Sequence, residues 1–230
     1  MKASLIVFPG TNREPDMAMA LERVTGKKPA FVWHKDTELG KPDLIVLPGG
    51  FSYGDYLRCG AMAAHSPVMK EVIRLAGGGT RVLGVCNGFQ MLVETHLLPG
   101  ALLRNNSLKF ICKHVNLRCE NADTDFTGKM KKGEIIRVPI AHGEGNYFAD
   151  EATLDALEAN GQVAFRYCND NGDVTDEANC NGAARNIAGV FNEGKTILGM
   201  MPHPENAVLD WQDNLTGLKL FEGIVESLGA

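Results

Sequence analysis

The segment GVCNGFQ, residues 84–90, places a cysteine between two glycines directly after an apolar run. Gly84 and Gly88 flank Cys86 with the spacing of a nucleophile elbow, in which a sharp strand-to-helix turn exposes the central side chain. A helical pattern follows over 87–97. The unpaired amides and the dipole at a helix N-terminus favour negative charge, so a cysteine there gains thiolate character. This context predicts a nucleophilic thiol at Cys86. A buried structural cysteine is the alternative, and it is our interpretation of the other cysteines.

A thiolate nucleophile needs a base that moves protons and a carboxylate that orients the base. Two H-x-E tripeptides, at His142–Glu144 and His203–Glu205, compete for this role. Pro204 favours an extended backbone at His203, and residues i and i+2 of an extended segment point the same way. We therefore predict that His203 is the base and that Glu205 orients it. We interpret His142 and Glu144 as a site-edge or partner-contact loop, and a locally hydrogen-bonded loop histidine is an equally open interpretation of His142.

The elements that must position these residues follow a β-α-β-α order. Apolar runs at 4–8, 44–47 and 82–85 are separated by helical patterns at 16–24 and 61–75. Near-continuous apolar strands between helices predict a parallel sheet that is covered on both faces. Ligands gather at the carboxyl ends of such strands. The glycine-containing loops PGTN, PGGFSYGD and CNGFQ, which follow the three runs, are therefore expected to form the site.

The pattern changes from about residue 105 onward. Strand-like pieces at 109–119 and 135–140 precede a polar loop and then a hairpin. Residues 189–196 satisfy the phosphate-loop pattern G-x-x-x-x-G-K-[ST], but a true phosphate loop opens a helix whose amides meet the phosphates. Apolar strand-like residues follow here instead, so we interpret 192–195 as a hairpin turn. Without a repeat or a low-complexity linker, we expect a single domain over 1–230.

The composition excludes several classes of protein. A 230-residue chain with 44% hydrophobic and 22% charged residues is ordinary for a globular protein with a sizeable core. The net charge of −5 argues against nucleic acid or an anionic membrane as the main partner. The apolar stretch in the N-terminal MKASLIVFPG is too short for a signal-peptide core, no apolar run approaches the length of a membrane span, and the cysteines lack the spacing of a zinc site. We therefore expect a cytoplasmic protein with reduced thiols and no metal.

GVCNGFQ and MPHPE together resemble the class I glutamine amidotransferases, whose triad is Cys-His-Glu. Further blocks are similar to the glutaminase subunits of phosphoribosylformylglycinamidine synthases: IVFPGTNREPDMAMALE, LPGGFSYGDYLRCGAMAA, FICKHVNLRCEN, PIAHGEGNYF and GMMPHPENAV. The resemblance spans nearly the whole chain. It implies an α/β, flavodoxin-like three-layer sandwich with a mostly parallel central sheet and helices on both faces. It also implies a glutaminase that supplies ammonia to a partner synthase subunit in purine biosynthesis.

The resemblance implies a role for each site residue. Cys86 would attack the side-chain amide carbon of glutamine and form a glutamyl thioester. His203, oriented by Glu205, would protonate the departing ammonia and later activate water. The backbone N–H groups of Gly50 and Asn87 would stabilise the tetrahedral oxyanion. The remaining implied residues are Gln90, Asn106, Ser107 and Phe110 for substrate binding, and Arg58, His142 and Glu144 for the partner or the edge of the site.

The resemblance also implies the partners. A large synthase subunit would use ATP and Mg²⁺, a small accessory subunit would complete the complex, and this chain would bind L-glutamine and no cofactor of its own. Two other classes of function remain open. A free-standing thiol hydrolase or peptidase on a related elbow sandwich would need neither Gln90 nor a partner. A non-catalytic regulatory module is disfavoured because every element of a triad is present.

Overall fold

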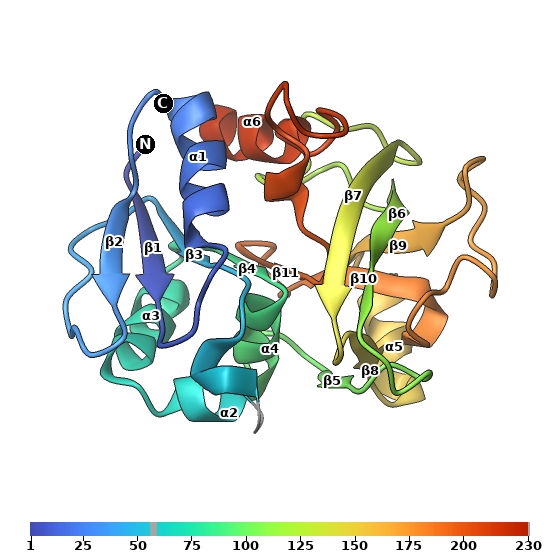
Figure 1. The fold of residues 1–230 in the computed structure, drawn as a ribbon, viewed down its shortest axis with the longest axis horizontal. Helices are drawn as coiled ribbons and strands as arrows, with labels where there is room; N and C mark the ends of the chain where they lie inside the picture. Colours follow the sequence, from blue (N-terminus) through green and yellow to red (C-terminus); the bar gives the residue numbers. More distant parts are fainter. Residues whose placement is uncertain (56–58, 230) are drawn as a thin grey trace.

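The computed structural model describes residues 1–55 and 59–229 of the chain. The described residues form a large mixed sheet with helices on both faces and a small second sheet (Figure 1). The strands are β1 (Ala3–Val7), β2 (Ala30–Trp33), β3 (Leu44–Leu47), β4 (Arg81–Val85), β5 (Ala101–Leu103), β6 (Ile111–Cys119), β7 (Ile135–His142), β8 (Asn146–Phe148), β9 (Val163–Cys168), β10 (Ile187–Phe191) and β11 (Ile197–Met200). The helices are α1 (Glu14–Thr25), α2 (Cys59–Ala64), α3 (Pro67–Gly77), α4 (Asn87–Glu94), α5 (Glu151–Ala159) and α6 (Leu218–Ser227), with the short 3₁₀ helices η1 (Ser52–Asp55), η2 (Ala184–Asn186) and η3 (Pro204–Asn206).

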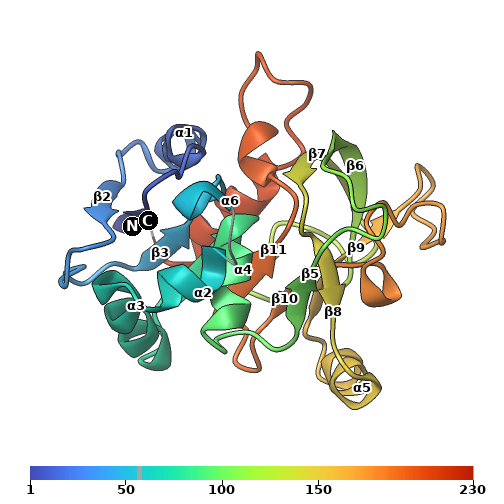
Figure 2. The ribbon, with the colours of Figure 1, turned by 60° about the horizontal axis from the view of Figure 1, so that its bottom comes forward.

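The large sheet of the described residues has the strand order β2-β1-β3-β4-β11-β10-β9-β6-β7. Its strands pair in parallel from β2 through β11 and antiparallel from β11 through β7. Around the parallel half, α1 and α6 lie on one face and α3 and α4 on the other (Figure 1). In Figure 2, β5 and β8, which form the second sheet, lie beside α4. The expected fold class, a sandwich with helices on both faces of a central sheet, is confirmed.

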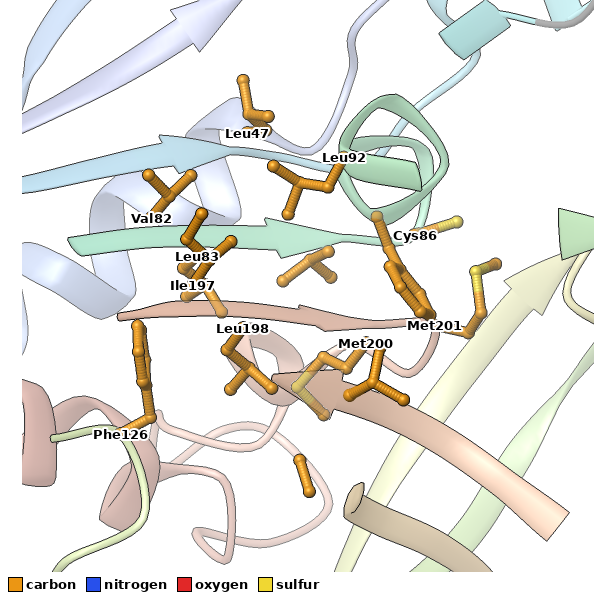
Figure 3. Packing of buried hydrophobic residues seen from close by; sticks show 14 of the residues in the cluster. Leu47, Val82, Leu83, Cys86, Leu92, Phe126, Ile197, Leu198, Met200 and Met201 are labelled. Atoms are coloured by element: carbon orange, nitrogen blue, oxygen red, sulfur yellow. The ribbon is translucent and has the colours of Figure 1, made fainter. Parts of the chain in front are cut away.

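The parallel strands bring three loops to one edge of the sheet. Leu47 of β3 lies opposite Gly84 of β4, and Met200 of β11 lies opposite Val85 of β4. The loops that follow these three strands therefore emerge side by side. The side chains of β3, β4, β11 and α4 form the apolar packing behind them, with Cys86 at its end (Figure 3). Burying each large apolar side chain in such a core contributes about 1.5–3 kcal/mol, so the loops rest on a rigid base.

Two helices differ from their predicted bounds. The pattern over 61–75 is divided between α2 and α3, because Ser66 is extended (φ −71°, ψ 148°) before Pro67, which opens α3. A single helix across this segment was therefore wrong. The helix predicted over 87–97 ends at Glu94, since the backbone leaves the helical region at His96 (φ 57°).

The hairpin predicted over the phosphate-loop pattern is confirmed. β10 and β11 pair antiparallel, with Val190 opposite Gly199. Asn192 Oδ1 accepts a hydrogen bond from the N–H of Ile197 across the turn at 2.9 Å. A strand rather than a helix follows Thr196, so no helix N-terminus is present here to hold phosphates. In the described part of the chain, no helix is long and apolar enough to cross a membrane.

Candidate active site

The elbow around Cys86 has the strained backbone that its spacing predicts. Cys86 ends β4 and precedes α4 with φ 52° and ψ −108°. A Cβ on Gly88 would lie 1.9 Å from the carbonyl oxygen of Leu47, and a Cβ on Gly84 would lie 2.8 Å from the backbone of Gly88. Only glycine fits at these two positions, because the backbones of β3, β4 and α4 pack directly against one another there. The sequence pattern thus reports a real packing constraint, and it holds the thiol at the N-terminus of α4.

The His203–Glu205 pair follows β11 at the same edge of the sheet. His203 Nδ1 lies 2.7 Å from Glu205 Oε1, and the His203 N–H donates to the carbonyl of Pro139 at 2.8 Å. The expected extended segment is wrong, because His203 (φ −103°, ψ 86°) leads directly into the 3₁₀ turn η3. The two side chains therefore meet across a tight turn rather than along a strand.

Cys86 and His203 are immediate neighbours. A Cβ on Gly49 would lie 3.3 Å from Cys86 Cβ and 2.7 Å from His203 Cε1, so the same glycine contacts both residues. The Cys86 thiol is also 3.8 Å from the carbonyl oxygen of Ala141 in β7. Gly49 is therefore required where the β3 loop passes the two side chains.

Burial and charge act in opposite directions on His203. The side chain is 2% exposed and Glu205 is fully buried. Burial disfavours the imidazolium, but the Glu205 carboxylate and the Cys86 side chain outweigh it and raise the pKa of His203 to about 10. The other carboxylate oxygen, Oε2 of Glu205, has no hydrogen-bond partner among the described residues, so the imidazole is the partner of this buried acid. The arrangement favours a protonated imidazole beside the Cys86 sulfur, and such an imidazolium can act as a general acid toward a leaving group.

The buried environments of three other cysteines make their thiols much less reactive. Burial raises the pKa of the Cys119 thiol to about 12, and those of Cys168 and Cys180 to about 11. A neutral buried thiol is a poor nucleophile. Cys86 differs from these three because it combines an elbow with a neighbouring imidazole. Cys112 is exposed, so the prediction of a buried structural cysteine is wrong at that position.

The loop that carries Gly50 is held against the β1–α1 loop. Gly50 has φ 144°, and a Cβ there would lie 2.7 Å from the backbone nitrogen of Asn12. The N–H of Phe51 donates to Gly10 O at 3.1 Å, and the N–H of Tyr53 donates to Pro9 O. These bonds do not involve the N–H of Gly50. The Gly49–Gly50 peptide thus borders Cys86 and His203, which is where an oxyanion donor must lie.

The predicted substrate residues fall into two groups. Gln90 is 7% exposed, and its Nε2 donates to Glu144 O at 2.9 Å. Asn106 and Ser107 are exposed on the loop before β6, where Asn106 packs on Gly182. Phe110 is 53% exposed and stacks on Phe51 of the Gly50 loop, with ring centroids 6.1 Å apart. Gln90 is therefore buried next to the elbow and Phe110 borders the Gly50 loop, whereas Asn106 and Ser107 are exposed and have no shown contact with either.

His142 lies at the end of β7 rather than on a loop, and its side chain is 3% exposed. The Nδ2 of Asn105 donates hydrogen bonds to the carbonyl oxygens of Lys109 and His142, and its Oδ1 accepts one from the N–H of Gly145. This orientation of the amide is fixed by those bonds, and it places Oδ1 3.1 Å from His142 Nδ1. His142 Nδ1 must therefore carry the proton. Burial, with the nearby His203 next, lowers the pKa of His142 to about 4.

The burial of His142 does not fit a partner contact for its side chain. Glu144 has a side chain that is 40% exposed and lies 3.7 Å from Arg104 Nε, and its role at the edge of the site stays a prediction. Arg58 lies outside the described residues. The sequence did not indicate Asn105, which is fully buried and orients His142, because a single asparagine in a polar stretch carries no pattern.

No three His, Cys, Asp or Glu side chains gather as potential metal ligands within residues 1–55 and 59–229. The site is instead an arrangement of thiol, imidazole, carboxylate and backbone N–H groups. Such a set performs acyl transfer through a covalent intermediate.

Comparisons with known proteins agree with this geometry. Residues 1–223 match the family model of the CobB/CobQ-like glutamine amidotransferase domain. The phosphoribosylformylglycinamidine synthase subunit PurQ of Rhodopseudomonas palustris (strain BisB18) is 58% identical and is aligned over 99% of this chain and 98% of the relative. The subunit of the same name from Rhizobium etli is 52% identical over the full length of both chains.

Solved structures give the same answer. "Structure of PurLQS from Thermotoga maritima" matches with a TM-score of 0.87 and 44% identity, over 99% of this chain and 98% of that chain. Another glutamine amidotransferase of Thermotoga maritima matches with a TM-score of 0.56 at 19% identity, over 90% of this chain and 77% of that chain, which speaks for the fold alone. The elbow, the His–Glu pair and the full-length matches agree, and the chain belongs to the glutamine amidotransferase family, within the PurQ subunits of phosphoribosylformylglycinamidine synthase.

Proposed function

We propose that this chain hydrolyses glutamine to glutamate and ammonia and supplies the ammonia to a synthase subunit that converts formylglycinamide ribonucleotide to formylglycinamidine ribonucleotide with ATP. The observation that carries the proposal is the Cys86 elbow beside the buried His203–Glu205 pair, with Nδ1 and Oε1 2.7 Å apart. The family membership supplies the reaction in which the ammonia is used.

The chemistry follows from the positions of these groups. Cys86 gives its proton to His203 and its sulfur attacks the amide carbon of the substrate, and the negative charge that develops on the amide oxygen is stabilised by the N–H groups of Gly50 and Asn87. His203, protonated beside Glu205, gives its proton to the leaving ammonia. The thioester then reacts with a water molecule that His203 deprotonates, which releases glutamate and restores the thiol.

We propose that Gln90 helps to hold the substrate and that the rim around Phe51 and Phe110 lies at the mouth of the site. Partners of this chain would be a large synthase subunit, which uses ATP and Mg²⁺, and a small accessory subunit. The hairpin turn at 192–195 supports the view that this chain binds no ATP itself. Cys86, Cys112, Cys119, Cys168 and Cys180 are free, and a cytoplasmic setting would keep such thiols reduced. The alternative of a free-standing thiol hydrolase or peptidase is disfavoured, because the full-length relatives are named as synthase subunits.

The decisive experiment bypasses the glutaminase with its own product. In the assembled synthase, Cys86→Ala should abolish glutamine-driven amidine synthesis, because no thioester can form. Synthesis driven by high concentrations of ammonium salt at alkaline pH should continue. Loss of both reactions in a folded, assembled variant would show that Cys86 does more than release ammonia and would refute the proposal.

A further inference from the structure

The side chain of Asn87 joins three parts of the site. Asn87 is the first residue of α4 and is 2% exposed. Its Oδ1 accepts a hydrogen bond from the N–H of Ser52 at 2.8 Å, and its Nδ2 donates to Gln90 Oε1 at 2.7 Å. Ser52 belongs to the loop of Gly50, whereas Gln90 lies one helical turn beyond Cys86. From this geometry, and resting on the proposed glutaminase function, we infer that the Asn87 side chain is a positioning residue that holds the oxyanion loop and the amide of Gln90 in register with the elbow.

The orientation of each amide in this chain of hydrogen bonds is fixed by its neighbour. The N–H of Ser52 can only donate, so it must face Asn87 Oδ1, and Asn87 Nδ2 then faces Gln90. Gln90 must present its Oε1 to Asn87, which turns its Nε2 toward the carbonyl of Glu144 at 2.9 Å. The bonds run in one direction across the site, from the Gly50 loop through α4 to the turn after β7. Reversing any one amide would break its bonds on both sides.

This chain of bonds sets the distance between the two proposed oxyanion donors. The N–H groups of Phe51 and Tyr53 attach the Gly50 loop to the β1–α1 loop. The bond from Ser52 to Asn87 attaches the same loop to the elbow, two residues after Gly50. The N–H of Asn87 is thus one proposed donor, and the side chain of the same residue holds the loop of the other proposed donor, the N–H of Gly50. An error of about 1 Å in such a position costs roughly 10² in rate.

The substitution Asn87→Ala removes this connection and keeps the reacting groups. The backbone N–H of residue 87, the Cys86 sulfur and the His203–Glu205 pair all remain. The Ser52 N–H and Gln90 Oε1, both buried, lose the hydrogen bonds that Asn87 provides, so the loop and the Gln90 amide are held less firmly against the elbow. Acyl transfer develops an oxyanion and depends on the loop, whereas alkylation of Cys86 by iodoacetamide displaces iodide and develops no oxyanion.

The experiment uses the assembled synthase complex and three variants. Asn87→Ala should lower kcat for glutamine hydrolysis by about 10- to 100-fold, while the second-order rate of Cys86 alkylation stays within about threefold. Gln90→Leu breaks the second half of the chain of bonds and should raise KM for glutamine more than it lowers kcat. Asn121→Ala is the matched control, because Asn121 also bridges backbone groups, Gly161 O and the N–H of Asp123, at the far end of β6. It should leave kcat and KM unchanged.

Three results would overturn the inference. A kcat for Asn87→Ala within threefold of the wild-type value would show that the side chain positions nothing that matters. Equal losses in kcat and in the alkylation rate, with a lowered melting temperature, would show a general structural role. Absence of glutamine turnover by the wild-type complex would refute the proposed function itself and the inference with it. If Asn87→Ala does not fold, Asn87→Ser carries the same test, because its hydroxyl can pair with one of the two groups left behind.

Discussion

The substitution Glu205→Gln tests the source of the charge on His203. Glutamine keeps an oxygen that can accept the hydrogen bond from Nδ1, now 2.7 Å long, but it removes the negative charge. Two unit charges about 4 Å apart interact by about 4 kcal/mol at an effective dielectric constant of about 20. At about 1.36 kcal/mol per pKa unit, this corresponds to about 3 units. The pKa of His203, which is about 10, should therefore fall to roughly 7 in the variant.

This shift has a measurable consequence for glutamine hydrolysis. Release of ammonia needs the protonated imidazole, so the alkaline limb of the pH profile of kcat/KM follows the pKa of His203. In Glu205→Gln this limb should move down by about 3 pH units, and at pH 8 only about a tenth of the imidazole should remain protonated. We therefore expect kcat/KM at pH 8 to fall at least about tenfold, with a larger loss at higher pH.

The assay is a set of glutaminase pH profiles of the assembled complex from pH 6 to pH 10. Glu71→Gln is the matched control, because it makes the same chemical change at a surface carboxylate that pairs with Arg74 on α3. Its profile should coincide with that of the wild type. If Glu205→Gln keeps both the wild-type alkaline limb and kcat/KM within threefold, the carboxylate does not set the charge of His203 and the electrostatic argument fails.

The remaining predictions concern stability. The pKa of His142 is about 4 when folded and about 6.5 when unfolded, so the unfolded chain binds more protons between these values. The contribution of His142 to the free energy of unfolding is fully present above pH 6.5. It is lost as the pH falls toward 4, by up to about 3 kcal/mol. Urea titrations of His142→Asn, which keeps a donor toward Asn105, should show a shallower acid slope than the wild type, and equal slopes would contradict the assignment. Gly88→Ala should cost about 3 kcal/mol, because its Cβ would lie 1.9 Å from Leu47 O, whereas Gly77→Ala, which meets nothing within 4 Å, should be nearly neutral. Equal urea midpoints for the two alanine variants would refute the packing argument at the elbow.

Much of the fold could be predicted because its signals are local. The three apolar runs became β1, β3 and β4 within a residue or so of their expected bounds, since buried parallel strands have a continuous apolar pattern. The prediction missed the break between α2 and α3, which is caused by the extended backbone that Pro67 imposes on Ser66. The same kind of local signal, Pro204 after His203, misled the prediction of an extended segment. There the turn η3 prevailed, and it still brings Nδ1 and Oε1 together.

The candidate site could be predicted only where its chemical groups belong to short sequence motifs. The spacing of Gly84, Cys86 and Gly88 reports close backbone packing, which any sequence that makes this turn must satisfy. The roles of Asn106, Ser107 and Phe110 remain predictions, and all three side chains are exposed. His142 was undecided by sequence because its environment is made by residues far away in the chain.

The sequence by itself determined the elbow around Cys86 and the parallel strands, and it predicted the nucleophile and the choice of a His–Glu pair, because each depends on residues within a few positions of one another. Only the tertiary structure decided that β11 lies beside β4, which brings His203 to Cys86. It also decided that Ser52 meets Asn87 across 35 residues and that Asn105 meets His142 across 37. The physical reason is that a hydrogen bond between distant segments leaves no periodicity in the sequence. The orientation of an amide or an imidazole is set only when the folded chain brings its donors and acceptors together.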